Sequence, residues 1–165
     1  GCFCYVVLDD FENCLDPLDE LTVYVPDETA STGDEVRLRL FANRTNQPLR
    51  YTWQLLEAPK SSKVGLHHST GSASVSTPYE YHYLEDRSTT IEPDVPGTYK
   101  VRLVAELVWA DVVTGETGVV AETTSHIEVT GESLRGCAAS PEAPRALWAI
   151  LLGSIAAIGM RRRRD

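Results

Sequence analysis

Hydrophobic and polar residues alternate with a period of two through much of residues 21–130, and this pattern is typical of half-buried β-strands. In EVRLRLFA (35–42), for example, Val or Leu at every second position alternates with Arg. The alternating segments are 21–25, 35–42, 49–56, 98–107 and 125–129. No stretch between them keeps a helical period. The pattern therefore predicts an all-β fold, an antiparallel sandwich of two sheets.

Three landmarks follow one another in the chain: YTW at 51–53, APKSS at 58–62, and EPDVPGTY at 92–99, which runs into a long strand. This order resembles the polycystic-kidney-disease (PKD) type of immunoglobulin-like domain over about residues 20–130. We expect Trp53 to fill the centre between the sheets. Tyr99 should bury its ring while its hydroxyl binds near the turn, and Gly97 should supply a backbone conformation that a Cβ would resist.

Residues 63–89 depart from the PKD pattern, because a compact member needs far fewer residues there. We expect a mobile loop insertion with one extra hairpin, forming a contact surface together with the TGETG tip at 114–118. The candidate contact patch is Tyr79, Tyr81, His82 and Tyr83. The alternative is that the tyrosines pack on the sandwich as part of an extra strand.

The last hairpin is a second departure, because its arms, 99–113 and 119–130, are unusually long for this fold. A strand of 15 residues would extend roughly 50 Å. We expect a bulge near residues 109–111 to bend it.

Residues 146–160, ALWAILLGSIAAIGM, contain no charged side chain and precede Arg161, Arg162, Arg163 and Arg164. A helix of this length would extend roughly 22 Å, less than the ~30 Å hydrocarbon core of a bilayer, which suits a signal-type segment better than a permanent span. The arginines should stay cytoplasmic, which places the body on the opposite side of the membrane.

The order Gly136-Cys137, Pro-rich spacer, short apolar segment, Arg cluster resembles the myxobacterial C-terminal sorting tail (MYXO-CTERM) over residues 136–165. The resemblance implies processing near Gly136-Cys137 by a sorting protease, membrane attachment through the tail, and a location in the cell envelope, at the cell surface on its extracytoplasmic face. The alternative for Cys137 is an ordinary disulfide.

Three further cysteines lie in the acidic N-terminal segment. Exported proteins meet oxidising conditions, so we expect Cys14 to pair with Cys4 or with Cys2. In the first case Cys2 is a candidate lipid-bearing residue, because it follows Gly1 as in a lipoprotein. A thiolate metal site and calcium binding by the acids of residues 9–20 are open alternatives.

The sequence contains no catalytic or phosphate-binding motif, and we expect no enzyme, no resident metal and no cofactor. The net charge of -9 also argues against nucleic-acid binding. A small hydrolase using His67, His68 or His82 is a minor alternative.

The predicted organisation has four parts: 1–20, an acidic segment with cysteines; 21–130, the sandwich; 131–145, a linker; and 146–165, the sorting tail. The predicted function is a non-catalytic, surface-anchored module for adhesion, ligand binding or spacing. Its ligand would be a surface protein or a glycan. The alternative is a subunit of a larger envelope assembly that docks through residues 63–89 or the last hairpin.

Overall fold

The computed structural model describes residues 15–44, 46–74, 80–84 and 87–134. The predicted C-terminal apolar helix, Gly136, Cys137, Arg161 to Arg164, and the N-terminal Cys2, Cys4 and Cys14 all lie outside the described residues. In the part that is described, no helical segment has the length and hydrophobicity needed to cross a membrane.

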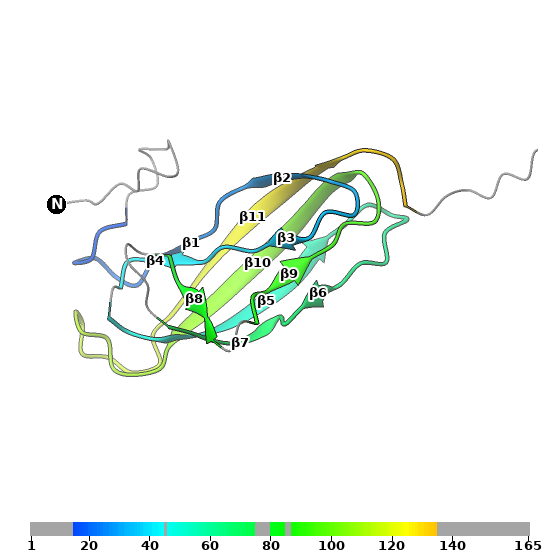
Figure 1. Cartoon of the computed structure of the whole chain (residues 1–165). Coiled ribbons are helices and arrows are strands. Elements are labelled where there is room, and N and C mark those ends of the chain that lie inside the picture. Colours follow the sequence, from blue (N-terminus) through cyan, green and yellow to red (C-terminus); the bar gives the residue numbers. More distant parts are fainter. Residues whose placement is uncertain (1–14, 45, 75–79, 85–86, 135–165) are drawn as a thin grey trace, which may run out of the picture. The chain divides into compact units, whose positions relative to one another are not determined.

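The described chain is built of β-strands (Figure 1). In chain order they are β1 (Val23–Tyr24), β2 (Glu28–Ser31), β3 (Val36–Arg37), β4 (Phe41–Ala42), β5 (Leu49–Glu57), β6 (Leu66–His67), β7 (Thr70–Ser74), β8 (His82–Tyr83), β9 (Thr90–Ile91), β10 (Gly97–Leu107) and β11 (Val120–Thr130). The alternating segments of the sequence fall in or around β1, β3, β4, β5, β10 and β11. The prediction of an all-β fold is confirmed.

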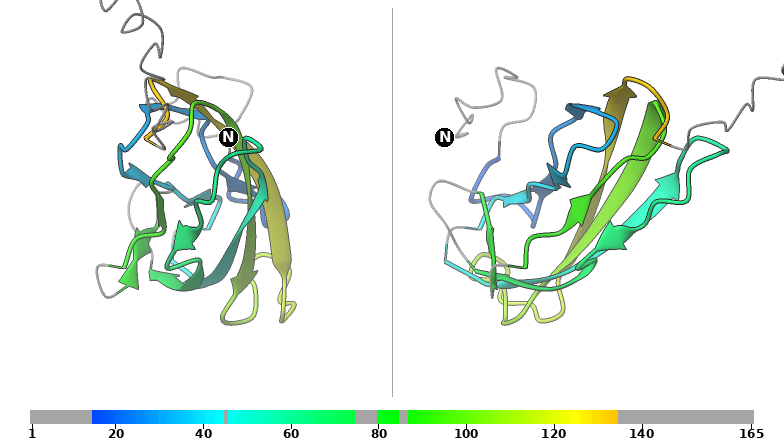
Figure 2. Two further views of the ribbon diagram at one scale, coloured as in Figure 1. Left: turned by 90° about the vertical axis from the view of Figure 1, so that its right-hand side faces the viewer. Right: turned by 45° about the vertical axis from the view of Figure 1, so that its right-hand side comes forward.

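The strands form two layers (Figure 2). One layer is a six-stranded sheet with the order β2-β11-β10-β5-β7-β8, and the other consists of β3-β9-β6 and the pair β1-β4. In the immunoglobulin-like arrangement, the third, sixth and seventh strands of the basic fold share one sheet. Here β5, β10 and β11, which are neighbours in the six-stranded sheet, take those places. The sandwich is not wholly antiparallel as predicted, because β2 pairs with β11 in parallel, with Ile127 opposite Glu28.

The core lies between the layers and takes one residue in two from each long strand. On β10, Tyr99, Val101, Leu103, Ala105 and Leu107 are all buried. Trp53 on β5 is also buried, and its Nε1 donates to the Tyr83 hydroxyl at 3.1 Å. The Tyr83 hydroxyl donates in turn to Leu38 O at 2.6 Å, so a hydrogen-bonded chain crosses from one layer to the other.

Tyr99, buried near the start of β10, donates its hydroxyl to Val95 O in the preceding turn at 2.8 Å. A tyrosine that bonds back to the backbone just before its own strand is a feature of immunoglobulin-like sandwiches. Gly97 has φ 134°, a conformation that side-chain-bearing residues rarely adopt.

The last hairpin differs from the prediction of two very long arms. β10 ends at Leu107, and residues 108–118 form a loop in place of a bulged strand. Val108 N still donates to Pro48 O at 3.1 Å, in register with Leu107 opposite Leu49. Beyond this bond the chain turns back on itself, because Asp111 N donates to Glu116 O and Gly115 N donates to Asp111 O, both at 2.7 Å. The irregularity in this part of the sheet lies elsewhere, between Lys100 and Val101, where the register with β5 shifts.

Candidate functional site

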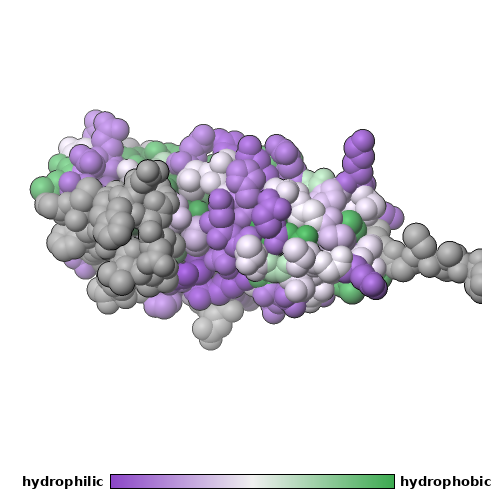
Figure 3. Space-filling view, turned by 90° about the horizontal axis from the view of Figure 1, so that it is seen from above, coloured by the Kyte–Doolittle hydropathy of each residue, from purple (hydrophilic) through white to green (hydrophobic). Residues whose placement is uncertain are grey.

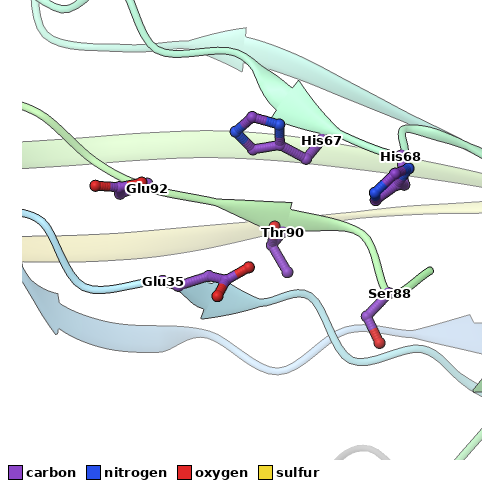
Figure 4. Close-up of a pocket in the computed structure, with 6 residues that line it drawn as sticks. All are labelled: Glu35, His67, His68, Ser88, Thr90 and Glu92. Atoms are coloured by element: carbon purple, nitrogen blue, oxygen red, sulfur yellow. The ribbon is translucent and has the colours of Figure 1, made fainter. Parts of the chain in front are cut away.

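A hollow of about 400 Å³ lies on the outer face of the sheet β3-β9-β6. Its lining residues are Glu35, His67, His68, Ser88, Thr90 and Glu92 (Figure 4). The register explains the set: Thr90 is opposite both Arg37 and His67, while Ile91, between Val36 and Leu66, faces the core. Residues two positions away on the same strands, Glu35 and Glu92, therefore share the outer face.

His67 and His68 both line the hollow, although neighbours on a regular strand point to opposite faces. His68 has φ 51°, the left-handed conformation, and its carbonyl accepts a hydrogen bond from Thr89 Oγ1 at 2.7 Å. At this bend the chain leaves the three-stranded sheet and joins β5, where Trp53 N donates to Ser69 O at 2.7 Å. The bend therefore brings the two imidazoles to one site.

The hollow offers two carboxylates and two imidazoles to a small polar ligand (Figure 4). The Ser88 hydroxyl already has a hydrogen-bond partner, because it accepts from Arg37 Nε at 3.1 Å. Across the described ranges, no group of three His, Cys, Asp or Glu side chains is placed to hold a metal ion. His82, the third histidine of the hydrolase alternative, lies on β8 in the other sheet.

The proposed contact patch is wrong for two of its members. Tyr81 and Tyr83 are both buried. Tyr83 packs edge-on against Tyr51, with ring centroids 4.9 Å apart. The Tyr81 hydroxyl lies 2.6 Å from Arg44 O and 2.9 Å from Gln47 O. Burial raises the pKa of both tyrosines well above the usual value. His82 is exposed, and Tyr79 lies outside the described residues.

Tyr83 instead follows the alternative prediction of an extra strand, whereas Tyr81 lies just before β8 and its backbone N donates to Leu40 O at 2.7 Å. β8 pairs with β7, with Tyr83 opposite Ala73, so part of the 63–89 insertion extends the six-stranded sheet.

A buried ion pair fixes the end of the sandwich at which residues 108–118 lie. Arg44 Nε and Nη2 donate to the two carboxylate oxygens of Asp111 at 2.7 and 2.8 Å, and both side chains are almost fully buried. The same guanidinium donates to Asp19 O at 2.8 Å and lies 3.4 Å from Pro17 O. Hydrogen bonding by Arg44 lowers the pKa of Asp111 to about 2.

Gln47 holds the loop from a second side. Its Nε2 donates to Ala110 O at 2.7 Å, and its Oε1 accepts from Val112 N at 3.1 Å. The loop nevertheless exposes apolar side chains: Trp109 is 62% exposed and Val112 is 73% exposed. We call residues 108–118 the end loop.

The sequence analysis missed both Arg44 and Asp111. Neither stands out from its neighbours in the chain, and their pairing across 67 positions follows only from the folding of the two layers. The one available signal was that Asp111 lies where the sequence predicts a bulge in the arm 99–113.

The surface seen from above the molecule is mostly hydrophilic, with small hydrophobic groups near its two ends (Figure 3). This agrees with the composition of the described body, in which exposed large hydrophobic residues are few. They are Leu18, Leu56, Leu84, Trp109, Val112, Val113, Val120 and Leu134.

Comparisons with known proteins identify no family for this chain. No family model matches it, and no curated protein matches it. Among solved structures, the titin M3 domain is 14% identical, with 65% of this chain and 91% of that chain covered and a TM-score of 0.36. A PapD-like domain (domain 7) of human CEP192 is 12% identical, with 71% and 88% covered and a TM-score of 0.37.

The third cohesin ScaC from Acetivibrio cellulolyticus, solved in complex with the ScaB dockerin, is 12% identical, with 67% and 99% covered and a TM-score of 0.34. At these TM-scores the similarities carry no inference about this chain. Its two-layer architecture rests on its own strand pairing.

Proposed function

We propose that this chain is a non-catalytic binding module of the cell envelope. It is a PKD-type sandwich, held at the cell surface through its C-terminal segment, and it binds a protein partner through the end loop. The observation that carries the binding role is the exposure of Trp109 and Val112 on a loop whose backbone is fixed by Arg44 and Gln47.

Exposed apolar side chains on a fixed loop favour binding for two reasons. Tryptophan is enriched among the residues that contribute most to interfaces. A loop that is already ordered loses little conformational entropy when it binds. This arrangement favours the envelope-assembly alternative, with the last hairpin as docking element, over a simple spacer.

The charge around the end loop indicates the chemistry of the partner. Residues 1–136 carry a net charge of -12, and the exposed Glu116 lies on the end loop itself. Opposite charges across an interface guide association. The partner is therefore a protein with an apolar pocket and a basic rim.

The anchoring half of the proposal rests on the sequence of the tail. Gly136-Cys137, the uncharged run 146–160 and Arg161 to Arg164 follow the order of the myxobacterial sorting tail. A sorting protease would cut near Cys137, and the body would remain attached to the surface.

The binding role is tested by crosslinking the full-length chain to its partner in envelope preparations. Trp109→Ala should reduce the yield of the specific crosslinked product at least about tenfold, since truncating a central tryptophan typically removes more than 2 kcal/mol. Leu56→Ala, an exposed residue on β5, is the matched control and should crosslink normally. Equal yields from both variants would remove the end loop from the interface.

The anchoring is tested by intact-mass measurement of the native protein. We expect a mature chain that lacks about the last 25 residues, as in a processed sorting tail. Recovery of a chain ending in Asp165 would contradict processing. If the tail is cut, Cys137→Ser should leave uncut precursor or release the body into the medium, and normal surface retention would exclude Cys137.

A further inference from the structure

β11 has a neighbour along the whole of one side but along only part of the other. On the first side it pairs with β10 from Gly97–Val129 to Glu106–Val120. On the second side it pairs with β2 only from Ile127 to Thr130 (Figure 1). In the described chain, no strand is paired with the second side of residues 120–126.

The register shows which backbone groups face this unpaired side. Leu107 N donates to Val119 O at 3.0 Å, so residue 119 and every second residue after it direct their amides and carbonyls to β10. Val120, Glu122, Thr124 and His126 therefore direct theirs away from β10. His126 agrees, because its N–H donates outward to Asp27 Oδ1 at 2.7 Å.

Asp27 thus binds the outward amide of His126. The outward amides and carbonyls of Val120, Glu122 and Thr124 lie in a row along the same side of β11. We call these three residues the open edge. An unpaired strand edge of this kind is a template for an added strand.

The core-facing side of β11 is also incompletely covered at this place. Ser125, Ile127 and Val129 share one face of the strand and are all buried. Ala121 and Thr123 continue that face but are only half-buried. The open edge therefore coincides with a gap in the cover of the core, which an added strand with apolar side chains would close.

We propose that residues 2–8 of this same chain, CFCYVVL, add to the open edge as a further strand of the six-stranded sheet. This run is uncharged and rich in aromatic and β-branched residues, which favour strands. This proposal is independent of the proposed binding partner, because it concerns the edge of β11 and not the end loop.

The N-terminal segment enters the described structure close to this edge. Arg44 binds Asp19 O and Asp111 with the same guanidinium, so residues 17–19 lie against the loop that leads into β11. Leu15 is fixed there by packing on Phe41. Residue 8 lies seven positions before Leu15. The extended chain between them would reach roughly 23 Å, which exceeds the roughly 13 Å length of the open edge.

Charge favours residues 2–8 over a second copy of the chain. Two copies paired through their open edges about Glu122 would place that carboxylate opposite its equivalent, and like charges directly opposite are destabilising. Glu122 already forms an ion pair with Arg102 on its own sheet. The uncharged run 2–8 brings no such repulsion.

Amide hydrogen exchange of the full-length chain tests the proposal residue by residue. In the wild type, the amides of Glu122 and Thr124 should exchange at least about tenfold more slowly than in the variant Tyr5→Pro/Val6→Pro. Adjacent residues of a strand direct their amides to opposite sides, so one of the two prolines must face β11, where it cannot donate to the ladder. Ala121 and Thr123, whose amides face β10, should be equally protected in both chains. Glu12→Pro, outside the run, should behave as wild type.

Three results would overturn the proposal. Fast exchange at Glu122 and Thr124 in the wild type would mean that nothing occupies the edge. Protection that persists in Tyr5→Pro/Val6→Pro would mean that another segment or molecule does. Protection that disappears on dilution would assign the edge to a second copy.

A second variant tests the edge from the other side. Thr124→Pro removes an outward amide and leaves the β10 ladder intact, because the Thr124 amide points away from β10. It should increase chymotryptic cleavage after Phe3 and Tyr5 at least about tenfold over wild type. Unchanged cleavage in a variant whose Ala121 and Thr123 amides stay protected would contradict the proposal.

Discussion

Arg44 is the residue on which the end of the sandwich depends. Its guanidinium contacts the backbone carbonyls of Pro17 and Asp19 and pairs with Asp111 of the end loop. A buried charge of this kind is stable only because the bidentate partner and the backbone carbonyls replace the water that it loses.

We predict that Arg44→Met lowers the free energy of unfolding by about 3 to 5 kcal/mol, because Asp111 is left buried without its partner. The double variant Arg44→Met/Asp111→Leu should recover much of this loss, since neither charge then remains. Urea unfolding of the four chains of the cycle measures the coupling. A double variant as unstable as the sum of the single ones would show that the two side chains do not act as a pair.

Asp111 also predicts an acid dependence. Its pKa of about 2 lies below the ordinary value of an aspartate, near 3.9, so its ionised form contributes stability that is fully present above pH 4. This contribution, about 2 kcal/mol, is lost as the pH falls from about 4 to about 2. Denaturant midpoints at pH 5 and pH 2.5 should differ less in Asp111→Asn than in the wild type. Equal differences would contradict a depressed pKa.

Among the elements, the turn that leads into β10 combines two features of the immunoglobulin-like fold. Tyr99 bonds back to Val95, and Gly97 turns the chain between them into the strand. A Cβ on Gly97 would lie 2.9 Å from Pro59 Cγ, so space and backbone conformation both require glycine.

We predict that Gly97→Ala destabilises the fold by about 1 to 3 kcal/mol, the usual cost of forcing a side-chain-bearing residue into such a conformation. Gly65→Ala is the control, because an added Cβ there meets nothing within 4 Å and its φ is not positive. Thermal unfolding of both variants tests the pair. A Gly97→Ala chain as stable as Gly65→Ala would show that the turn relaxes freely.

The segment 66–74 shows how an element can serve both layers. β6 belongs to the three-stranded sheet and β7 to the six-stranded one, and only the bend at His68 separates them. The insertion 63–89 is therefore partly built into the sandwich, although its sequence reads as a polar loop.

At the scale of the whole molecule, the charge divides between an acidic body and a basic C-terminal segment. Residues 137–165 carry +3 and the remainder -12. This division supports the proposal that the two parts face different surroundings, since the arginines would remain on the cytoplasmic side during export.

The cysteines give a prediction at the same scale. We expect Cys14 to be bonded to Cys4 or Cys2 and Cys137 to be bonded to none of the three, because the sorting-tail resemblance assigns Cys137 to processing. Peptide mapping of the native protein without reduction measures this. A disulfide between Cys137 and an N-terminal cysteine would contradict that assignment.

The all-β class, the residues of the core faces and the role of the Tyr99 turn follow from the sequence alone. These depend on local rules: side chains alternate across a strand, and a glycine before a strand permits an unusual turn. They hold for Leu38, Trp53 and Tyr99 whichever strands become neighbours.

Tertiary structure alone decides which segments meet. The parallel pairing of β2 with β11, the meeting of Arg44 with Asp111, the shared hollow of His67 and His68 and the burial of Tyr81 all depend on it. An exposed tyrosine and a buried one have the same local sequence pattern, and so do a solvated arginine and a paired one. The physical reason is that burial and pairing are set by contacts between residues distant in the chain, whose register no local period encodes.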